Sequence, residues 1–255
     1  MGRPAPLGTL SSSYRELPPP RHLAASVACL WVREVDDAGT HVVLPDGCID
    51  IVASRAGVLT AGPDTGPVPA TLSAGETIVG VRFRPGAAAP VLGWPASELR
   101  DQRIPLEELD GVKSFRAALE LGAAKKDLTP FIEAVARRLR DAPPPDPVVQ
   151  EAIAQLVGGA RVSDLPATLF ISERQLRRRF HASVGYGPKV FERVLRLQRM
   201  LALASATPGS LARLAAEAGY ADHAHMAAEC ARLTGQPPSA LLDGRVPQAQ
   251  EALAA

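Results

Sequence analysis

The segment ISERQLRRRF, residues 171–180, decides the fold predicted for the carboxy-terminal half of this 255-residue chain. Its apolar residues Leu176 and Phe180 are four positions apart, so a helix would bury both on one side. The opposite side would be polar and basic, with Arg174, Arg178 and His181 in line, flanked by Arg177 and Gln175. Arg179 turns back toward the buried side, where we expect it to contact backbone or a neighbouring helix. The segment therefore predicts an amphipathic helix with one basic face.

Cap and turn signals make this helix the second of a helix-turn-helix unit. Ser163 is the expected N-cap of a short helix that reaches about Leu169, and Pro166 is tolerated in its first turn. Ser172 is the expected N-cap of the basic helix, which should end near Gly185.

The same arrangement is predicted a second time. A helix over 148–157 opens the helical part of the chain, and a long helix is predicted over KVFERVLRLQRMLALASA, residues 189–206. LARLAAEAGY (211–220) and DHAHMAAECARLTG (222–235) then repeat the order of short helix, turn and longer helix. We call the longer second helix of each unit its recognition helix.

Basic residues gather around the first unit although the chain has a formal net charge of only +1. Residues 171–199 contain eight lysines and arginines against two glutamates. Such a composition suits contact with phosphates, and an arginine paired with a base edge discriminates bases by roughly 1–3 kcal/mol. The alternative is an ordinary solvated helix surface, which the repeated helix-turn-helix arrangement disfavours.

Residues 148–242 resemble the DNA-binding domain of AraC-type transcriptional regulators. The resemblance rests on ISERQLRRRF, on GPKVFERVLRLQRMLALA and on LAAEAGYADHAHMAAECARLTGQPPSALL. It implies two helix-turn-helix subdomains joined by a long linker helix. Their recognition helices would enter successive major-groove segments on one face of the DNA, about 34 Å apart.

The resemblance and the helical wheel together give the candidate site. For base readout we expect Arg174, Gln175, Arg177 and Arg178 in the first unit, and His223 and His225 in the second. For phosphate contacts we expect Ser172, His181, Lys189, Arg193 and Arg196.

Two departures from the family pattern bear on this site. Phe170 occupies the first turn where the family commonly has glycine, whereas the second turn keeps Gly219. If Met226 and Cys230 are buried, the exposed line of the second recognition helix consists of Ala224, Ala228 and Ala231. None of these alanines has a side chain that donates a hydrogen bond, so we expect the first unit to supply most of the base discrimination.

The amino-terminal half is predicted to be rich in β-strands. The strand candidates are HVVL (41–44), IDIVAS (49–54), GVLTAG (57–62) and TIVGVRF (77–83), with PDG (45–47) as a tight turn between the first two. SFRAALELGAA and PFIEAVARRLR show helical spacing within 111–140, and DAPPPDP (141–147) reads as a stiff linker.

The predicted fold class is α+β with two domains. The first is a β-rich sheet or small barrel with flanking helices, and the second is an all-α tandem helix-turn-helix with a long linker helix. The predicted boundaries are 1–140 for the first domain, 141–147 for the linker and 148–245 for the DNA-binding domain.

Parts of the first domain resemble an uncharacterised β-rich domain found ahead of AraC-type DNA-binding regions. The similar stretches are YRELPPPRHLAASVACLWV, LPDGCIDIV and VGVRFRPGAA, and they imply a ligand-sensing or dimerisation role. The candidate effector-pocket residues are Trp31, Arg82, Phe83, Arg84 and Trp94. The favoured alternative is that the aromatic residues fill the core and the arginines form salt bridges or lie in water.

Other kinds of site find little support. Cys29, Cys48 and Cys230 are odd in number and far apart, which argues against a disulfide framework or a zinc finger. Cys48 could act as a redox sensor with Cys29, but a buried structural cysteine is favoured. We expect no metal, no cofactor and no enzymatic activity, because no ligand spacing or catalytic motif stands out. The apolar run 23–32 is too short to span a bilayer and the amino terminus lacks a signal-peptide layout, so no membrane contact and a cytoplasmic location are expected.

The sequence therefore predicts a transcription regulator that binds double-stranded DNA and responds to an unknown small molecule bound to the first domain. A homodimer and contact with RNA polymerase are implied by the family. The alternative keeps the fold and changes the activity. The first domain would act on or sequester a small molecule or a protein, and the helical domain would be a weak, non-specific DNA-binding adaptor.

Overall fold

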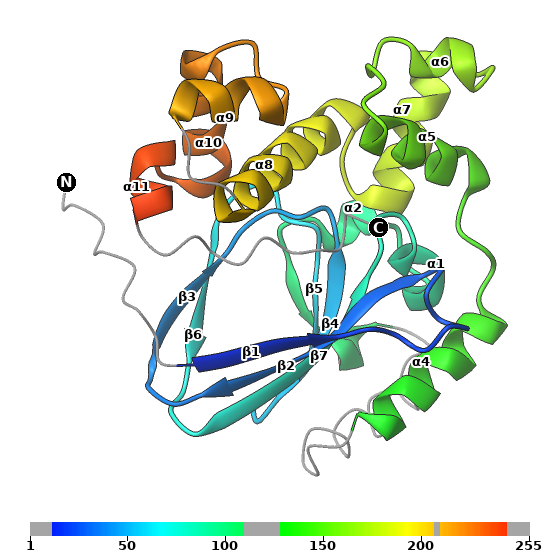
Figure 1. The fold of residues 1–255 in the computed structure, drawn as a ribbon. Coiled ribbons are helices and arrows are strands. Elements are labelled where there is room, and N and C mark those ends of the chain that lie inside the picture. Colours follow the sequence, from blue (N-terminus) through cyan, green and yellow to red (C-terminus); the bar gives the residue numbers. More distant parts are fainter. Residues whose placement is uncertain (1–11, 110–127, 207–209, 244–255) are drawn as a thin grey trace.

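The computed structural model describes residues 12–109, 128–206 and 210–243. A β-sheet region, made of a sheet with helices packed on it, precedes a helical region that begins at residue 147 (Figure 1). The fold is therefore α+β, with the sheet first and the helices after it, as the sequence predicts.

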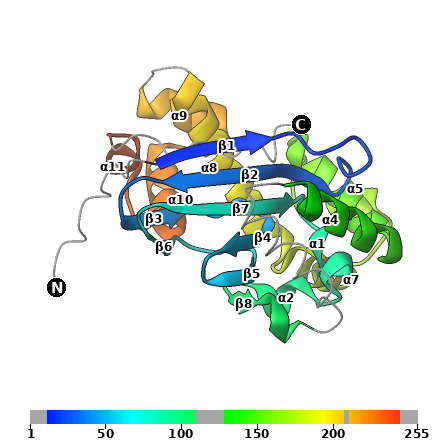
Figure 2. The same ribbon diagram turned by 90° about the horizontal axis from the view of Figure 1, so that it is seen from below.

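An antiparallel six-stranded sheet forms the centre of the β-sheet region, in the order β1-β2-β7-β4-β5-β8 (Figure 2). Its strands are β1 (Ser12–Leu17), β2 (Val27–Val35), β7 (Glu76–Phe83), β4 (Ile49–Ser54), β5 (Gly57–Ala61) and β8 (Arg103–Pro105). A separate two-stranded sheet pairs β3 (Gly39–Val43) with β6 (Val68–Leu72).

Hydrophobic cores lie on both faces of the six-stranded sheet, because alternate side chains along each strand point to opposite faces. Val81 and Phe83 of β7 share one core with the helices α1 (Ala88–Leu92), α2 (Ala96–Leu99) and α4 (Thr129–Asp141). Trp31 of β2 lies on the other face and packs with Leu72 of β6. The sheet is thus covered by helices on one side and by β3 and β6 on the other.

The helical region consists of two packed units that share one long helix. Its helices are α5 (Pro147–Val157), α6 (Leu165–Thr168), α7 (Glu173–Val184), α8 (Pro188–Ala206), α9 (Leu211–Ala218), α10 (His223–Thr234) and α11 (Pro238–Asp243). The first half of α8 packs with α5, α6 and α7, and its second half packs with α9, α10 and α11. Leu44 from the β-sheet region belongs to the second of these cores, so the two regions are in direct contact.

Most predicted elements are confirmed, and the exceptions have physical causes. Ser163 is not the N-cap of α6: Asp164 holds that position, and the Ser163 hydroxyl donates to its carboxylate at 3.0 Å. PDG does not join two paired strands, because β3 and β4 belong to different sheets, although Gly47 has the positive φ of 81° that the turn prediction requires. The predicted helical segment SFRAALELGAA lies outside the described residues.

Four strands have no counterpart among the strand candidates: β1, β2, β6 and β8. Within the described ranges, none of the helices combines the length and the apolar character needed to cross a membrane.

Candidate nucleic-acid interface

The basic helix α7 is fixed at both ends by its own sequence. Ser172 is the N-cap, and its hydroxyl accepts a hydrogen bond from the Gln175 backbone N–H at 3.2 Å. The Gln175 side chain accepts in return from the Ser172 backbone N–H at 3.0 Å, which completes a capping box. Gly185 ends the helix in the left-handed conformation, with a φ of 99°.

The amino-terminal end of α7 lies away from the sheet, and its carboxy-terminal end packs against α2 (Figure 1). A Cβ atom at Gly185 would lie only 2.9 Å from the Ala96 carbonyl oxygen of α2, so the contact is close. Leu176 and Phe180 are buried in the first helical core, as predicted. The free end of α7 therefore carries the cap and the first basic residues.

Three arginines on α7 face solvent without an acidic partner among the described residues. Arg174, Arg177 and Arg178 are exposed, and none of them forms an ion pair with a residue that the structure describes. Arg179 behaves differently, as its position on the wheel predicts: its Nη1 lies 3.1 Å from each carboxylate oxygen of Asp146, the N-cap of α5. The basic face predicted from the sequence is therefore open and available to an anion.

Two further residues predicted on this surface have local roles of their own. Gln175 uses its side-chain oxygen in the capping box, which leaves its amide nitrogen to face solvent. His181 is half-buried, and burial lowers its pKa, with Arg177 and Arg100 acting in the same direction. A histidine that is harder to protonate is a weaker partner for phosphate.

The basic residues of α8 divide into free and paired groups. Lys189 is exposed, and no ion pair holds it within the described part of the chain. Arg193 and Arg196 both pair with Glu229 of α10, at 3.3 and 2.9 Å. Arg199 instead donates to the Val157 carbonyl at the end of α5. Arg193 and Arg196, predicted as phosphate contacts, therefore connect α8 to α10.

Glu229 connects α10 to α8, a role that the sequence pattern did not predict. Its side chain is only 9% exposed, and it pairs with His225 at 3.3 Å as well as with the two arginines of α8. A signal was present: Glu229 stands three residues after Met226 and next to Cys230, on the buried side of the helix. A charge in that position requires a partner.

The second recognition helix, α10, presents few polar groups. Met226 and Cys230 are fully buried, and Ala224, Ala228 and Ala231 are exposed, so the predicted alanine line is confirmed.

The two histidines predicted for base readout on α10 differ in their surroundings. His225 accepts from the Ala221 backbone N–H through Nδ1 at 3.2 Å and contacts Glu229 through Nε2, so both of its ring nitrogens are engaged. His223 is exposed at the start of the helix.

The five residues predicted to form an effector pocket do not come together. Trp31 and Phe83 lie on opposite faces of the six-stranded sheet, in different cores. Arg84 donates to the Ala24 carbonyl at 2.9 Å, and Trp94 is half-buried beside α1. Trp31 and Phe83 therefore fill hydrophobic cores, which is the alternative to an effector pocket.

Arg82 forms a buried ion cluster on the face of the sheet that β3 and β6 cover. Its side chain is 5% exposed and contacts Glu16, Asp46 and Asp50 at 3.0 to 3.2 Å. Burial raises the pKa of Asp50 to about 6, although Arg82 acts against it. This cluster is the salt-bridge alternative that the sequence analysis favoured for Arg82.

The cysteines of this region are structural. Cys29 and Cys48 are free and buried. Burial raises the pKa of Cys29 to about 12 and that of Cys48 well above its usual value, so both thiols stay protonated. Protonated, buried thiols lack the thiolate character that a redox sensor needs. Within the described ranges no group of three histidine, cysteine or acidic side chains is placed to hold a metal ion.

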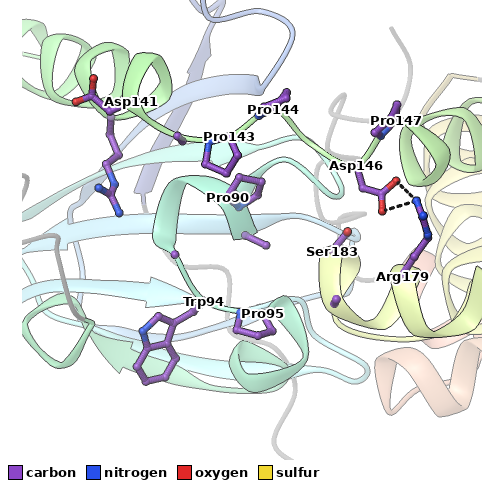
Figure 3. A pocket seen from close by; sticks show the side chains of 15 residues that line it. Pro90, Trp94, Pro95, Asp141, Pro143, Pro144, Asp146, Pro147, Arg179 and Ser183 are labelled. Carbon is purple, nitrogen blue, oxygen red and sulfur yellow. Dashed lines mark hydrogen bonds and ion pairs between the residues drawn. The ribbon is translucent and has the colours of Figure 1, made fainter. Parts of the chain in front are cut away.

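A groove of about 770 Å³ runs between the β-sheet region and α7 (Figure 3). Trp94 and Pro95 line one side, the linker prolines Pro143 and Pro144 line another, and the pair of Arg179 with Asp146 lies at one end. Ala182 and Ser183 of α7 also contribute to its wall. The groove thus connects the predicted linker, the β-sheet region and the first recognition helix.

Loop 44–48 is a second contact between the two regions, and no sequence pattern predicts it. The Gln198 side chain of α8 donates to the Pro45 carbonyl at 2.7 Å. Gly47 lies against Phe191 of α8. The Tyr186 hydroxyl is close by and has no hydrogen-bond partner within the described part of the chain.

Comparison with known proteins adds two domain matches. Residues 165–244 match the family model described as a helix-turn-helix domain, and residues 15–105 match a domain of unknown function (DUF6597). No curated protein has significant sequence similarity to the chain.

Among solved structures, the chain is similar to ToxT from Vibrio cholerae. An apo variant of ToxT is 12% identical, with 84% of this chain and 96% of that chain covered and a TM-score of 0.45. Another ToxT structure is 10% identical, with 92% and 97% covered and a TM-score of 0.43. ToxT with a bound unsaturated fatty acid is 12% identical, with 85% and 95% covered and a TM-score of 0.43.

Proposed function

Because the carboxy-terminal region is an AraC-type helix-turn-helix domain, we propose that the protein is a sequence-specific, DNA-binding transcription regulator. One observation carries this proposal: Arg174, Arg177 and Arg178 project from α7 without acidic partners in the described structure. Three unmatched cations on a capped helix suit a polyanion with a groove that admits a helix. The regulator does not need catalysis, and we propose no enzymatic activity.

In the proposed mechanism the free end of α7 enters the major groove. Arg174, Arg177 and Arg178 then reach base edges, where each planar guanidinium can make paired hydrogen bonds. Lys189 and the backbone N–H groups at the start of α7 contact phosphates and set the register. Gln175 is left with one free amide nitrogen, so its share in base readout is smaller than that of the arginines.

The second helix-turn-helix unit contributes less to recognition of the DNA sequence than the first. The exposed line of α10 is made of alanines, which are suited to apolar contact with thymine methyl groups. His223 is the polar side chain left for base or phosphate contact, since His225 is held by Glu229. We therefore propose an asymmetric reader whose base discrimination comes mainly from α7.

We place control by a small molecule at the groove beside α7. Its volume lies within the roughly 300–1,000 Å³ usual for ligand sites, and its apolar walls belong to both regions. An effector changes DNA affinity only if it binds one arrangement of the two regions better than another. Trp94 is the only member of the predicted pocket set that lines this groove in the described structure.

Cytoplasmic location, a homodimer and contact with RNA polymerase remain parts of the proposal that rest on the family. The boundaries 1–140, 141–147 and 148–245 fit the same proposal, because α4 ends at Asp141 and α5 begins at Pro147.

The decisive experiment selects duplexes from a random pool with the full chain and then measures affinity for the selected duplex. Arg174→Ala with Arg178→Ala should lower that affinity by about fivefold or more per arginine, since each contributes roughly 1–3 kcal/mol. Arg137→Ala with Arg140→Ala is the matched control, because it removes two exposed arginines from α4, which belongs to neither helix-turn-helix unit. Equal weak binding to every duplex, or full affinity in the first variant, would overturn the proposal.

The effector site has its own test. Native mass spectrometry of the purified chain should detect a bound small molecule, and Trp94→Ala should lose it. Retention of the molecule by Trp94→Ala places it outside the groove and rejects this site, without affecting the DNA-binding proposal.

A further inference from the structure

Phe170 is the large apolar side chain most exposed to solvent among the described residues. It is 93% exposed, whereas Leu17 and Val157 follow at 39% and 37%. Its backbone φ of 54° lies in the left-handed region, which favours glycine. The second unit has glycine at the corresponding turn, Gly219, with a φ of 87°. Phe170 thus combines a strained backbone with a solvated ring, and glycine would avoid both.

The surrounding turn explains why the ring points outward. Leu169 and Ile171 pack against the first helical core on either side of Phe170. The Ile171 backbone N–H donates to the Pro166 carbonyl at 3.1 Å, which closes the turn onto α6. Phe170 is also two residues before Ser172, the N-cap of α7. The exposed ring therefore stands beside the free end of the basic helix.

We propose that Phe170 is an apolar DNA-contact residue that packs on a thymine methyl group or a deoxyribose face at the rim of the groove entered by α7. The inference rests on the proposed function and adds to it a contact that carries no charge. Phenylalanine is a known partner of the thymine methyl group, and apolar side chains also wedge against base steps. A phosphate-lined groove with apolar methyl and sugar surfaces offers both kinds of partner at one place.

The charges around Phe170 favour DNA over an apolar protein surface. Arg174, Arg177 and Arg178 follow it within the next eight residues and have no acidic partners in the described structure. A protein that covered the ring would also cover these cations, which it could not leave unmatched without a cost in desolvation. DNA matches the arginines with phosphates and base edges while its methyl and sugar groups accept the ring.

The test compares the full chain with its Phe170→Gly variant on the duplex that the wild type selects. Glycine adopts the left-handed backbone easily, so the variant should unfold at the same temperature as the wild type or at a higher one. Its affinity for the duplex should nevertheless fall about tenfold, which corresponds to about 1.4 kcal/mol. The dependence of affinity on salt should not change, because no charge is removed. If Phe170 had only a structural role, its replacement would change the unfolding temperature and the affinity for DNA in the same direction.

Replacement of single thymines by deoxyuridine identifies the atoms that Phe170 touches. If the ring packs on a methyl group, the wild type loses affinity at one position and Phe170→Gly does not. If it packs on sugar, no deoxyuridine distinguishes the two proteins while the tenfold difference persists. Leu17→Thr is the control variant: it replaces an exposed apolar residue on β1 and should leave DNA affinity unchanged.

Equal affinity of Phe170→Gly and wild type for the selected duplex overturns the inference. If that variant binds DNA normally but fails to assemble with another protein or a second copy, the ring serves a protein contact and the inference is also overturned. The proposed function stands in both cases, because it fails only if the wild type shows no preference for any duplex or the arginine variants keep full affinity.

Discussion

Gln198, in the middle of the helix shared by the two helix-turn-helix units, donates a 2.7 Å hydrogen bond to the carbonyl of Pro45 in the β-sheet region. The next residue along the loop, Asp46, contacts the buried Arg82 at 3.2 Å. Loop 44–48 therefore joins the ion cluster inside the sheet to α8. Since α8 sets the spacing of the two recognition helices, a change within the sheet has a direct route to the DNA-binding surface.

The contact between loop 44–48 and α8 leaves two buried polar atoms without hydrogen bonds to the described part of the chain. The Oε1 atom of Gln198 and the hydroxyl of Tyr186 are buried and have no hydrogen-bond partner among the described residues. Buried polar atoms without partners cost about 1–3 kcal/mol each. Separation of loop 44–48 from α8 would let water reach them, which offsets part of the packing lost.

Gly47→Ala should weaken the contact between loop 44–48 and α8. A Cβ atom there would lie 2.8 Å from Phe191 Cε2, and the φ of 81° disfavours any side chain. We expect the free energy of unfolding to fall by about 2–4 kcal/mol, from left-handed strain and from overpacking together. Gly75→Ala, at a φ of 68° with open space around it, should show the strain alone. Equal losses in the two variants, measured by urea denaturation, would show that the contact with Phe191 contributes nothing.

Glu229→Gln should destabilise the second unit. The substitution leaves Arg193 and Arg196 without their shared carboxylate in a site that is largely buried, and breaking such a pair costs about 3–5 kcal/mol in a dry core. Partial exposure of Arg193 reduces this, so we expect a loss of about 2 kcal/mol in the free energy of unfolding. Glu217→Gln removes an exposed helical pair with Arg213 and should cost much less, because solvent screens the two charges. Thermal denaturation of both variants tests the difference.

The helices of the DNA-binding region could be predicted because their apolar residues recur at helical spacing and their ends carry caps. Strand β2 was not predicted, because both of its faces are buried and its sequence VACLWVREV shows no clear alternation. The exposed arginines of α7 follow from the wheel alone. The pairing of Arg193 and Arg196 with Glu229 does not, since more than thirty residues separate the partners. Burial of loop 44–48 likewise depends on how the two regions pack.

His41→Gln should change how stability depends on pH. Burial lowers the pKa of His41 to about 4, and the nearby Arg33 lowers it further. The folded pKa lies below the ordinary value of about 6.5, so His41 contributes stability that is present above pH 6.5 and lost as pH falls toward 4. The difference in free energy of unfolding between wild type and His41→Gln should therefore grow as pH rises from about 4 to about 6.5.

The comparison with His41→Gln is needed because Asp50 changes stability with pH in the opposite direction over part of the same pH range. Its pKa is raised to about 6, so its contribution is full below its ordinary pKa and is lost as pH rises through 6. Both proteins contain Asp50, and the difference between them removes its effect. A pH-independent difference in urea titrations would contradict the assignment of a neutral, buried His41.

Lys189→Ala should weaken DNA binding without altering sequence preference. Lys189 is exposed at the start of α8 and has no ion pair within the described part of the chain, so we assign it to a phosphate. Loss of one phosphate contact lowers affinity for selected and random duplexes by the same factor, and it reduces the slope of log affinity against log salt by about 1. Arg178→Ala differs, because it should reduce the preference for the selected duplex over a random one. Binding titrations from low to moderate salt separate the two outcomes. If Lys189→Ala instead lowers affinity for the selected duplex alone, Lys189 takes part in base readout and the division of roles between α7 and α8 must be redrawn.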